Sequence, residues 1–330
     1  MAEPLFDLAS LAKPLVTAPL ALERLDLDRD RRVQAGFGDR PEPLTVRQLL
    51  SHSAGLPPWL PYTGEPLARQ LARGFPAGAH PKLVRPPVGT SCYSDLGYRL
   101  LAELLERETG TPFADLGRAR SGLEPAPWAT PPPFAPQGQD AGMWRLVEPA
   151  LAFPARDPHL PNDANARAGM PGHAGFGATP SAMAGCLERW LAAGLPARMA
   201  VDTARGADGS RWGLGLQRAL TGSGRFGDLL AAIPAGVSGV RLRVWDAVRL
   251  SPPAPPLAEP PGPPSAFWFH LGYTGPALFV RPEDGLCLAI LAHRLGPAGE
   301  LLDPEQLRAR RWEALAELVA GCVGTGPGSR

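Results

Sequence analysis

The sequence predicts an α/β (α+β) fold in which a central antiparallel sheet flanked by helices carries an inserted helical lobe. Three observations lead to this expectation. Helical periodicity dominates the first two thirds of the 330 residues. Strand-like segments are concentrated in the last third, and an amphipathic helix follows them at residues 304–323. A chain of this length suffices for one large domain or for two closely packed lobes.

The first predicted helix spans residues 11–25, where apolar residues dominate. Proline is tolerated in a first helical turn, where the amide donors lack partners anyway, so Pro14 indicates that the helix begins near Ser10. Pro19 fits less well inside a helix and predicts a kink or a short break.

Three further helices carry signals at their ends. A short helix after Thr45 has a capping box with Gln48, and Gly55 suits a left-handed position past its end. A longer helix within residues 94–110 shows leucines at helical spacing and stops at a glycine. The helix within residues 179–194 begins with a threonine cap and a first-turn proline, and it also stops at a glycine.

The last third contains the predicted strands. The stretches RWGLGLQ and VRLRVWDAV have strand character, and residues 267–294 are typical of a hairpin with its turn at 282–285. Two segments rich in proline are expected to be loops, a long surface excursion at 121–162 and a shorter loop at 251–265.

Composition excludes several classes of function. The chain has 33 basic and 32 acidic residues, so no strong charge points to nucleic acid as a partner. No apolar run approaches the ~20 residues that cross a bilayer, and the N-terminus lacks the basic start and apolar core of a signal peptide. The four cysteines form no C-x-x-C pair, which favours free thiols in a reducing compartment. We therefore expect the chain, as written, to be cytoplasmic.

Ser10 and Lys13 form the pattern S-x-x-K. On a helix these positions share a face, with roughly 5–6 Å between their Cβ atoms, so Lys13 can reach the Ser10 hydroxyl. A serine hydroxyl needs an adjacent base to become an effective nucleophile. A helix cap and a solvated surface lysine are the alternative interpretation. The pattern is more informative than usual here, because Lys13 and Lys82 are the only lysines among the 33 basic residues.

Five stretches, in order along the chain, resemble the serine β-lactamase and penicillin-binding-protein superfamily, and most closely its class C-like and esterase branch. FDLASLAK resembles the nucleophile segment, and LTVRQLLSHSAGLP resembles the helix and loop between the lobes. YSDLGYRLLAELLERETG is similar to the Y-x-N motif with its helix. NDANARAGMPGHAGFGATPSAM and HLGYTGPALFVRPEDGLCLAILAHR resemble the segment with GHAGLFST and the K-T-G or H-x-G hairpin.

The resemblance implies a catalytic apparatus. Ser10 would be the nucleophile and Lys13 its base. Tyr93 would pass protons between the nucleophile and the leaving group. The backbone amides of Ser10 and Tyr273 would form the oxyanion hole, which is often the largest catalytic contribution.

Two motifs that are expected to support catalysis or bind substrate depart from the family pattern. Asp95 stands where the family usually has Asn; it could hold Lys13 as an ion pair, which would favour a charged lysine. His270, Leu271 and Gly272 replace K-T-G, so a titratable imidazole replaces a fixed positive charge and a hydroxyl is lost. These changes weaken recognition of anionic β-lactams and suit a neutral ester or amide. Gly272 would let the strand edge approach the substrate.

His52 and His173 lie in segments that are structural in the family, so both are expected to be satisfied packing residues. The six histidines show no metal-ligand spacing, and no nucleotide-binding motif is convincing, so no metal or cofactor is expected.

The resemblance also implies an organisation for the chain. Residues 1–330 would form a single domain, with residues 15–200 as the mainly helical lobe and residues 1–14 plus 201–330 as the lobe that holds the sheet. Only nine residues precede Ser10, whereas relatives carry a helix and two strands there. Either the true start lies upstream, with a possible signal peptide, or the chain is a short form with an exposed sheet edge.

The expected function is a serine hydrolase that acts through an acyl-enzyme on a small ester or amide. A β-lactamase or D-Ala-D-Ala carboxypeptidase is the alternative enzyme. A catalytically inactive protein that binds a ligand or partner in the same cleft is the alternative of a different class. The expected partner is a small molecule, and the oligomeric state is left open.

Overall fold

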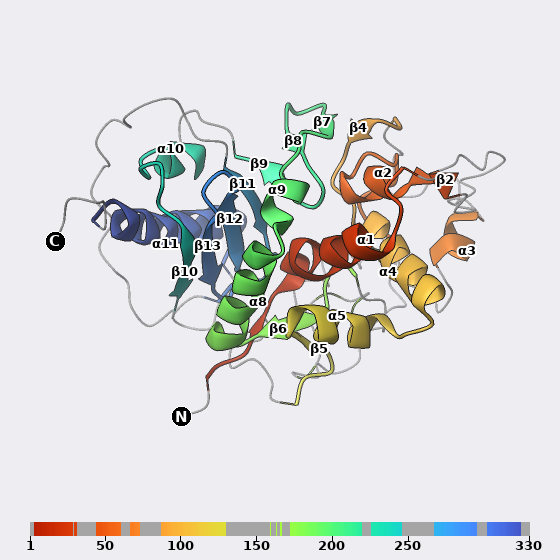
Figure 1. Cartoon of the computed structure of the whole chain (residues 1–330), viewed down its shortest axis with the longest axis horizontal. Coiled ribbons are helices and arrows are strands. Elements are labelled where there is room, and N and C mark those ends of the chain that lie inside the picture. Colours follow the sequence, from red (N-terminus) through yellow and green to blue (C-terminus); the bar gives the residue numbers. More distant parts are fainter. Residues whose placement is uncertain are drawn as a thin grey trace.

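The computed structural model describes residues 3–28, 30–31, 44–60, 67–72, 87–129, 159, 163, 166, 172–219, 226–245, 267–295 and 302–324. The loop expected at 251–265 and most of the one expected at 121–162 lie outside these residues. Figure 1 shows a sheet enclosed by helices and, beside it, a group of mainly helical elements.

The larger sheet has eight strands in the order β10, β13, β12, β11, β9, β8, β7, β4. In that order they are β10 (Gly239–Val244), β13 (Leu286–Leu291), β12 (Ala277–Arg281), β11 (Trp268–Leu271), β9 (Gln217–Arg218), β8 (Arg211–Trp212), β7 (Ala204–Gly206) and β4 (Thr90–Ser91). Neighbours from β13 to β7 are antiparallel. β10 and β4 join the two ends in parallel, so the sheet is mixed rather than antiparallel throughout.

The hairpin of β12 and β13 lies next to the edge strand β10. Ala277 lies opposite Ile290 and Arg281 opposite Leu286, which leaves the predicted turn at 282–285. Both strands are buried along their whole length. Their alternate side chains belong to two hydrophobic clusters, one with residues of α8 (Pro180–Ala192) and the other with residues of α11 (Pro304–Gly324). The sheet is therefore covered by helices on both faces, as predicted (Figure 1).

The remaining elements form the helical part and two small sheets. The helices are α1 (Ala18–Arg24), α2 (Val46–Leu50), α3 (Leu67–Ala72), α4 (Asp95–Thr109), α5 (Phe113–Ser121) and α9 (Leu195–Met199). A further helix, α10 (Phe226–Leu230), lies beside α11 and the larger sheet (Figure 1). The small sheets contain β1 (Phe6–Asp7), β6 (Phe176–Ala178) and β5 (Glu124–Pro125), and β2 (Asp30–Arg31) with β3 (Leu44–Thr45). The capping box of Thr45 with Gln48 is present. Gly110, the glycine expected to end α4, directly follows it and is left-handed, with a φ of 66°.

One local prediction needs correction, and a second is met with an addition. The first helix is not continuous: a 3₁₀ turn η1 (Ala9–Leu11) and a π-helical segment η2 (Lys13–Thr17) precede α1. Such segments change the pitch of the helix around the two prolines. Gly55 is left-handed as expected, with a φ of 67°, but it lies further along the loop; the residue that turns left-handed just past α2 is His52, with a φ of 57°.

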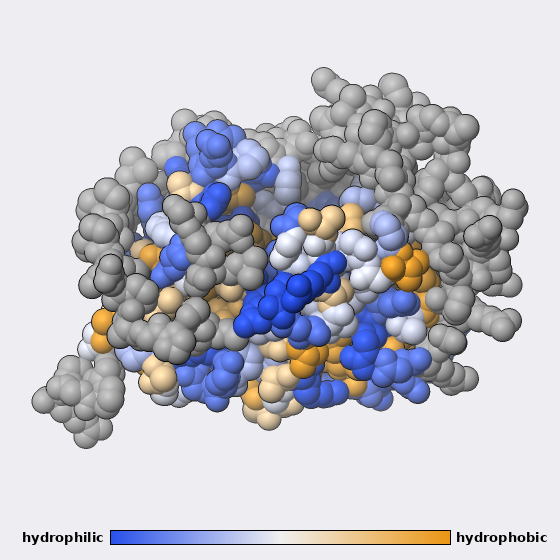
Figure 2. All heavy atoms as spheres, turned by 90° about the horizontal axis from the view of Figure 1, so that it is seen from above, coloured by the Kyte–Doolittle hydropathy of each residue, from blue (hydrophilic) through white to orange (hydrophobic). Residues whose placement is uncertain are grey.

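The surface of the described part is of mixed polarity. Figure 2 shows hydrophilic and hydrophobic residues interspersed on one face of the molecule, with the hydrophobic ones in small groups. Among the helices described, none has both the length and the apolar character needed to pass through a bilayer.

Candidate active site

Ser10 lies in η1, at the point where the chain enters the helical part. The residue before it, Ala9, has a φ of 45°, which is unusual for a residue with a side chain and marks local strain. The Ala9 amide donates to Asp7 Oδ1 at 2.8 Å, which holds this turn in place. The Lys13 Nζ lies 2.9 Å from the Ser10 Oγ, so the contact expected from the S-x-x-K spacing is present.

The Lys13 ammonium is enclosed by polar groups from three parts of the chain. It is 0 % exposed, donates to the His173 carbonyl at 3.1 Å and lies 2.7 Å from Asp95 Oδ1. Burial alone lowers the pKa of Lys13, but attraction to Asp95 and Tyr93 outweighs it, and the pKa is raised above its usual value. Lys13 is therefore charged at neutral pH, and it must lose a proton before it can act as a base.

Tyr93 stands between β4 and α4 and faces the same lysine. The Lys13 Nζ lies 4.9 Å from the centre of the Tyr93 ring. Burial raises the pKa of Tyr93, while interactions with Lys13 and with the Ser10 hydroxyl lower it in part. The phenol is therefore neutral at neutral pH, and it can donate a proton or a hydrogen bond.

The turn after β11 brings Gly272 and Tyr273 beside the Ser10 segment. A Cβ on Gly272 would lie 2.8 Å from the Leu8 carbonyl oxygen, so only glycine fits this approach. Thr274 Oγ1 donates to the Asp7 carbonyl at 2.8 Å and joins the two segments directly. The Tyr273 side chain is 47 % exposed, so this residue is not held in place by burial.

His270 and Leu271 are the last two residues of β11, and as neighbours in a strand they point to opposite faces of the sheet, with Leu271 against the cluster that contains α11 residues. His270 is buried, and burial together with the nearby charge of Lys13 lowers its pKa to about 3. Its imidazole is therefore neutral, not a substitute for a fixed positive charge. Its ring lies 5.9 Å from that of Tyr93 and 6.2 Å from that of Trp212, so these three rings line one wall of the site. Leu271 is half-buried and adds no polar group.

His52 contributes more than the satisfied packing expected of it. Its ring lies 4.7 Å from that of Tyr93, and its Nδ1 accepts from the Ser94 amide at 3.1 Å. Its carbonyl accepts from the Cys92 amide at 2.8 Å, so His52 holds both residues that flank Tyr93. Burial lowers its pKa well below the usual value, and Nε2 has no hydrogen-bond partner within the described chain.

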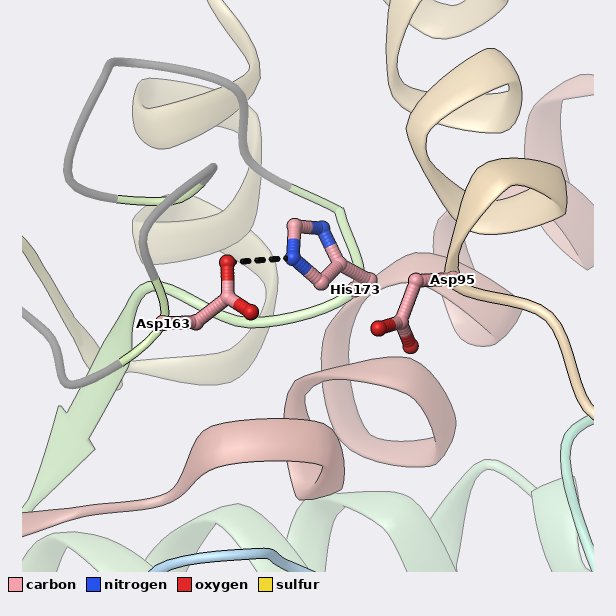
Figure 3. Close-up of side chains that lie close together, drawn as sticks. All are labelled: Asp95, Asp163 and His173. Atoms are coloured by element: carbon pink, nitrogen blue, oxygen red, sulfur yellow. Dashed lines mark hydrogen bonds and ion pairs between the residues drawn. The ribbon is translucent and has the colours of Figure 1, made fainter. Parts of the chain in front are cut away.

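A pair that sequence reasoning did not single out lies behind Lys13. Asp163 Oδ1 is 2.7 Å from His173 Nε2, and Figure 3 shows this pair with Asp95 nearby. Burial raises the pKa of Asp163, but His173 and other partners outweigh that effect and the pKa is lowered. The signal was present, since Asp163 precedes His173 in a segment already quoted for its resemblance. His173, expected only to pack, orients its own carbonyl toward Lys13.

Asp95, Asp163 and His173 also form the one group of described residues that could hold a metal ion, with ligand atoms within 4.8 Å of one another. The Lys13 ammonium already lies 2.7 Å from Asp95. A divalent ion there would stand against this buried positive charge, which is strongly unfavourable at such short range. The donor set therefore fits an ammonium partner, and we assign no ion to it.

Comparisons with known proteins show the family and the fold. A family model described as Beta-lactamase matches residues 2–311. Among solved structures, SurE with D-Leu is 23 % identical with a TM-score of 0.55; the match covers 98 % of this chain and 64 % of SurE, so the chain spans less than two thirds of that protein.

Two further solved structures show the same fold. The D-amino acid amidase from Ochrobactrum anthropi SV3, complexed with L-phenylalanine amide, is 18 % identical with a TM-score of 0.53, over 97 % of this chain and 85 % of the amidase. The class C beta lactamase from Rhodobacter sphaeroides is 18 % identical with a TM-score of 0.52, over 96 % of this chain and 86 % of the lactamase. No curated protein matches the chain in sequence.

Proposed function

The chain belongs to the beta-lactamase family of serine hydrolases, and from this premise we propose that it cleaves a small neutral ester or amide through an acyl-enzyme. The observation that carries the proposal is the buried Lys13 Nζ at 2.9 Å from the Ser10 Oγ, next to the Tyr93 ring. Burial of a charged amine is unfavourable. The burial of Lys13 beside the Ser10 hydroxyl therefore supports a catalytic role over a solvated surface lysine in an inactive cleft.

In the proposed reaction, the Ser10 Oγ attacks the substrate carbonyl and its proton passes to the Lys13–Tyr93 pair. The pair must first have released one proton to solvent, because Lys13 is charged and Tyr93 neutral at rest. The amides of Ser10 and Tyr273 would stabilise the oxyanion. The proton then moves to the leaving group, and water hydrolyses the acyl-enzyme by the reverse route.

The choice of a neutral substrate follows from the third motif. A β-lactam or a D-Ala-D-Ala end carries a carboxylate that needs a positive or hydroxyl-bearing partner. Here His270 is uncharged at neutral pH and Leu271 has no hydroxyl. Turnover of a chromogenic cephalosporin at a rate comparable with that of p-nitrophenyl acetate would contradict this choice and favour the β-lactamase alternative.

A second candidate is the amide of an amino acid with a free amine. Asp95 and Asp163 keep 17 % and 26 % of their side chains exposed, whereas Lys13 is 0 % exposed. Among the residues described, the charged groups beside Lys13 that a substrate could contact are thus these two carboxylates, which would attract a substrate amine. The comparison with a D-amino acid amidase supports this candidate. Cleavage of an amino-acid p-nitroanilide that is lost on N-acetylation would favour it over a neutral ester.

The first test is labelling with a fluorophosphonate probe, which reacts only with an activated serine. We expect the wild type to label and Ser10→Ala not to label. Ser181→Ala, an exposed serine in the first turn of α8, is the matched control and should label like the wild type. If folded wild type fails to label, the hydrolase proposal is wrong and the non-catalytic binding protein is favoured.

A further inference from the structure

We propose that Arg311, on the far helix α11, is a positioning residue for the oxyanion hole and acts through the peptide unit between Gly272 and Tyr273. The inference rests on the proposed function, because it assumes that the Tyr273 amide binds the oxyanion. No motif of the sequence points to Arg311, which lies more than a whole hairpin away from Tyr273 along the chain.

The guanidinium of Arg311 binds both ends of the turn that carries Tyr273. Its Nε donates to the Gly275 carbonyl at 2.9 Å, and its Nη2 donates to the Gly272 carbonyl. The side chain is buried, with 8 % of its surface exposed. A planar guanidinium can make two such bonds at once in a fixed geometry, whereas a lysine ammonium cannot span them in the same way.

The turn needs an external clamp. Tyr273 is half exposed, and its ring lies under the Arg294 guanidinium at 4.5 Å, a contact that is weaker than burial as an anchor for the turn. Gly275 has a φ of 133°, in a region that favours glycine, so the turn has little intrinsic preference for this shape. On the side of Ser10 the turn is tied by Thr274 to the Asp7 carbonyl. Arg311 supplies the tie on the opposite side.

The chemistry of the contact adds to its geometry. The Gly272 carbonyl and the Tyr273 amide belong to one peptide unit, in which electron density is shared across the C–N bond. A charged donor on the carbonyl withdraws electron density from the amide, and linked hydrogen bonds strengthen each other. Arg311 therefore makes the Tyr273 N–H a stronger donor at the point where negative charge would develop. Burial and the neighbouring Arg294 lower the pKa of Arg311 to about 10, which leaves it charged at neutral pH.

The test measures the second-order rate of fluorophosphonate labelling, because the P=O group of the probe would occupy the oxyanion hole. Removal of one oxyanion donor typically lowers a rate by about 10²–10³-fold. Weakening of the same donor should cost less: we expect a fall of about 10–100-fold for Arg311→Met, and a smaller fall for Arg311→Lys, which keeps the charge. Arg308→Met, on the exposed side of α11, is the matched control and should label at the wild-type rate.

The stoichiometry of labelling separates positioning from a folding defect. A positioning role predicts that every Arg311→Lys molecule labels in the end, only more slowly. A purely structural role predicts that a fraction labels at the wild-type rate and the rest never does. Full stoichiometry at the wild-type rate in Arg311→Lys and Arg311→Met would overturn the inference. If Arg311→Met does not fold, Arg311→Lys alone decides. Absence of labelling in the wild type would instead remove the proposed function, and this inference with it.

Discussion

Replacement of Asp95 by Asn should make Lys13 a better base. Asp95 Oδ1 lies 2.7 Å from the Lys13 Nζ and is one of the two main reasons why the pKa of Lys13 is raised. Asn keeps an oxygen that can accept the hydrogen bond but removes the charge. The burial that disfavours the ammonium stays, so the pKa of Lys13 should fall in Asp95→Asn.

The size of the effect follows from the distance. Two unit charges 2.7 Å apart interact by about 6 kcal/mol at an effective dielectric constant of about 20, and by about 3 kcal/mol at about 40. The lower figure is more appropriate, because Asp95 is 17 % exposed and water screens it. A change of about 3 kcal/mol corresponds to a roughly hundredfold larger population of neutral lysine while the ammonium still dominates.

The assay is the rate of fluorophosphonate labelling from pH 6 to 11. In the wild type the rate should still be rising at the alkaline end, because the neutral form of Lys13 accumulates only above its raised pKa. In Asp95→Asn this rise should move to lower pH, with labelling up to about a hundredfold faster near pH 7. Asp115→Asn removes a charge at an exposed position of α5 and should leave the profile unchanged. A slower Asp95→Asn enzyme whose profile keeps its wild-type position would refute Lys13 as the titrating base.

Three further outcomes can be checked with the same probe and with unfolding experiments. Gly272→Ala should label at least tenfold more slowly, because its Cβ would lie 2.8 Å from the Leu8 carbonyl. His52→Ala should slow labelling by loosening Tyr93, and His52→Asn should recover part of the rate, since Asn tolerates a left-handed φ. The folded protein holds the His270 imidazole neutral, because its pKa is lowered to about 3. The unfolded chain takes up a proton on this ring below pH 6.5, so the free energy of unfolding falls as the pH falls from 6.5 toward about 3. Urea unfolding at pH 7 and pH 5 should therefore show a smaller acid loss of stability in His270→Gln than in the wild type.

Local chemistry made much of the fold predictable. The capping box at Thr45 and the cap at Thr179 are decided within three or four residues, and the structure has both. The hairpin turn at 282–285 is likewise fixed by its own residues and by the apolar strands on each side. The contact between Ser10 and Lys13 also follows from their spacing, although the segment combines 3₁₀ and π turns rather than a regular helix.

Features decided by distant packing could not be read in the same way. The parallel pairing of β10 with β13 depends on which edge of the sheet is free once the chain has folded. The left-handed turns at Ala9 and His52 contradict the preference of their own residue types and persist because the surroundings impose them. The reach of Arg311 to the turn after β11 depends on how α11 docks on the sheet. Periodicity shows which face of such a helix is buried, but not which carbonyl its side chains meet.

The hydrogen bond from Thr274 to Asp7 joins residues 267 positions apart. Loops of that length close late, because the entropy lost in closing them must be offset by contacts that form only when most of the chain is in place. The Ser10 segment and the turn that carries Tyr273 are therefore expected to come together late in folding, after the local contact between Ser10 and Lys13 has formed.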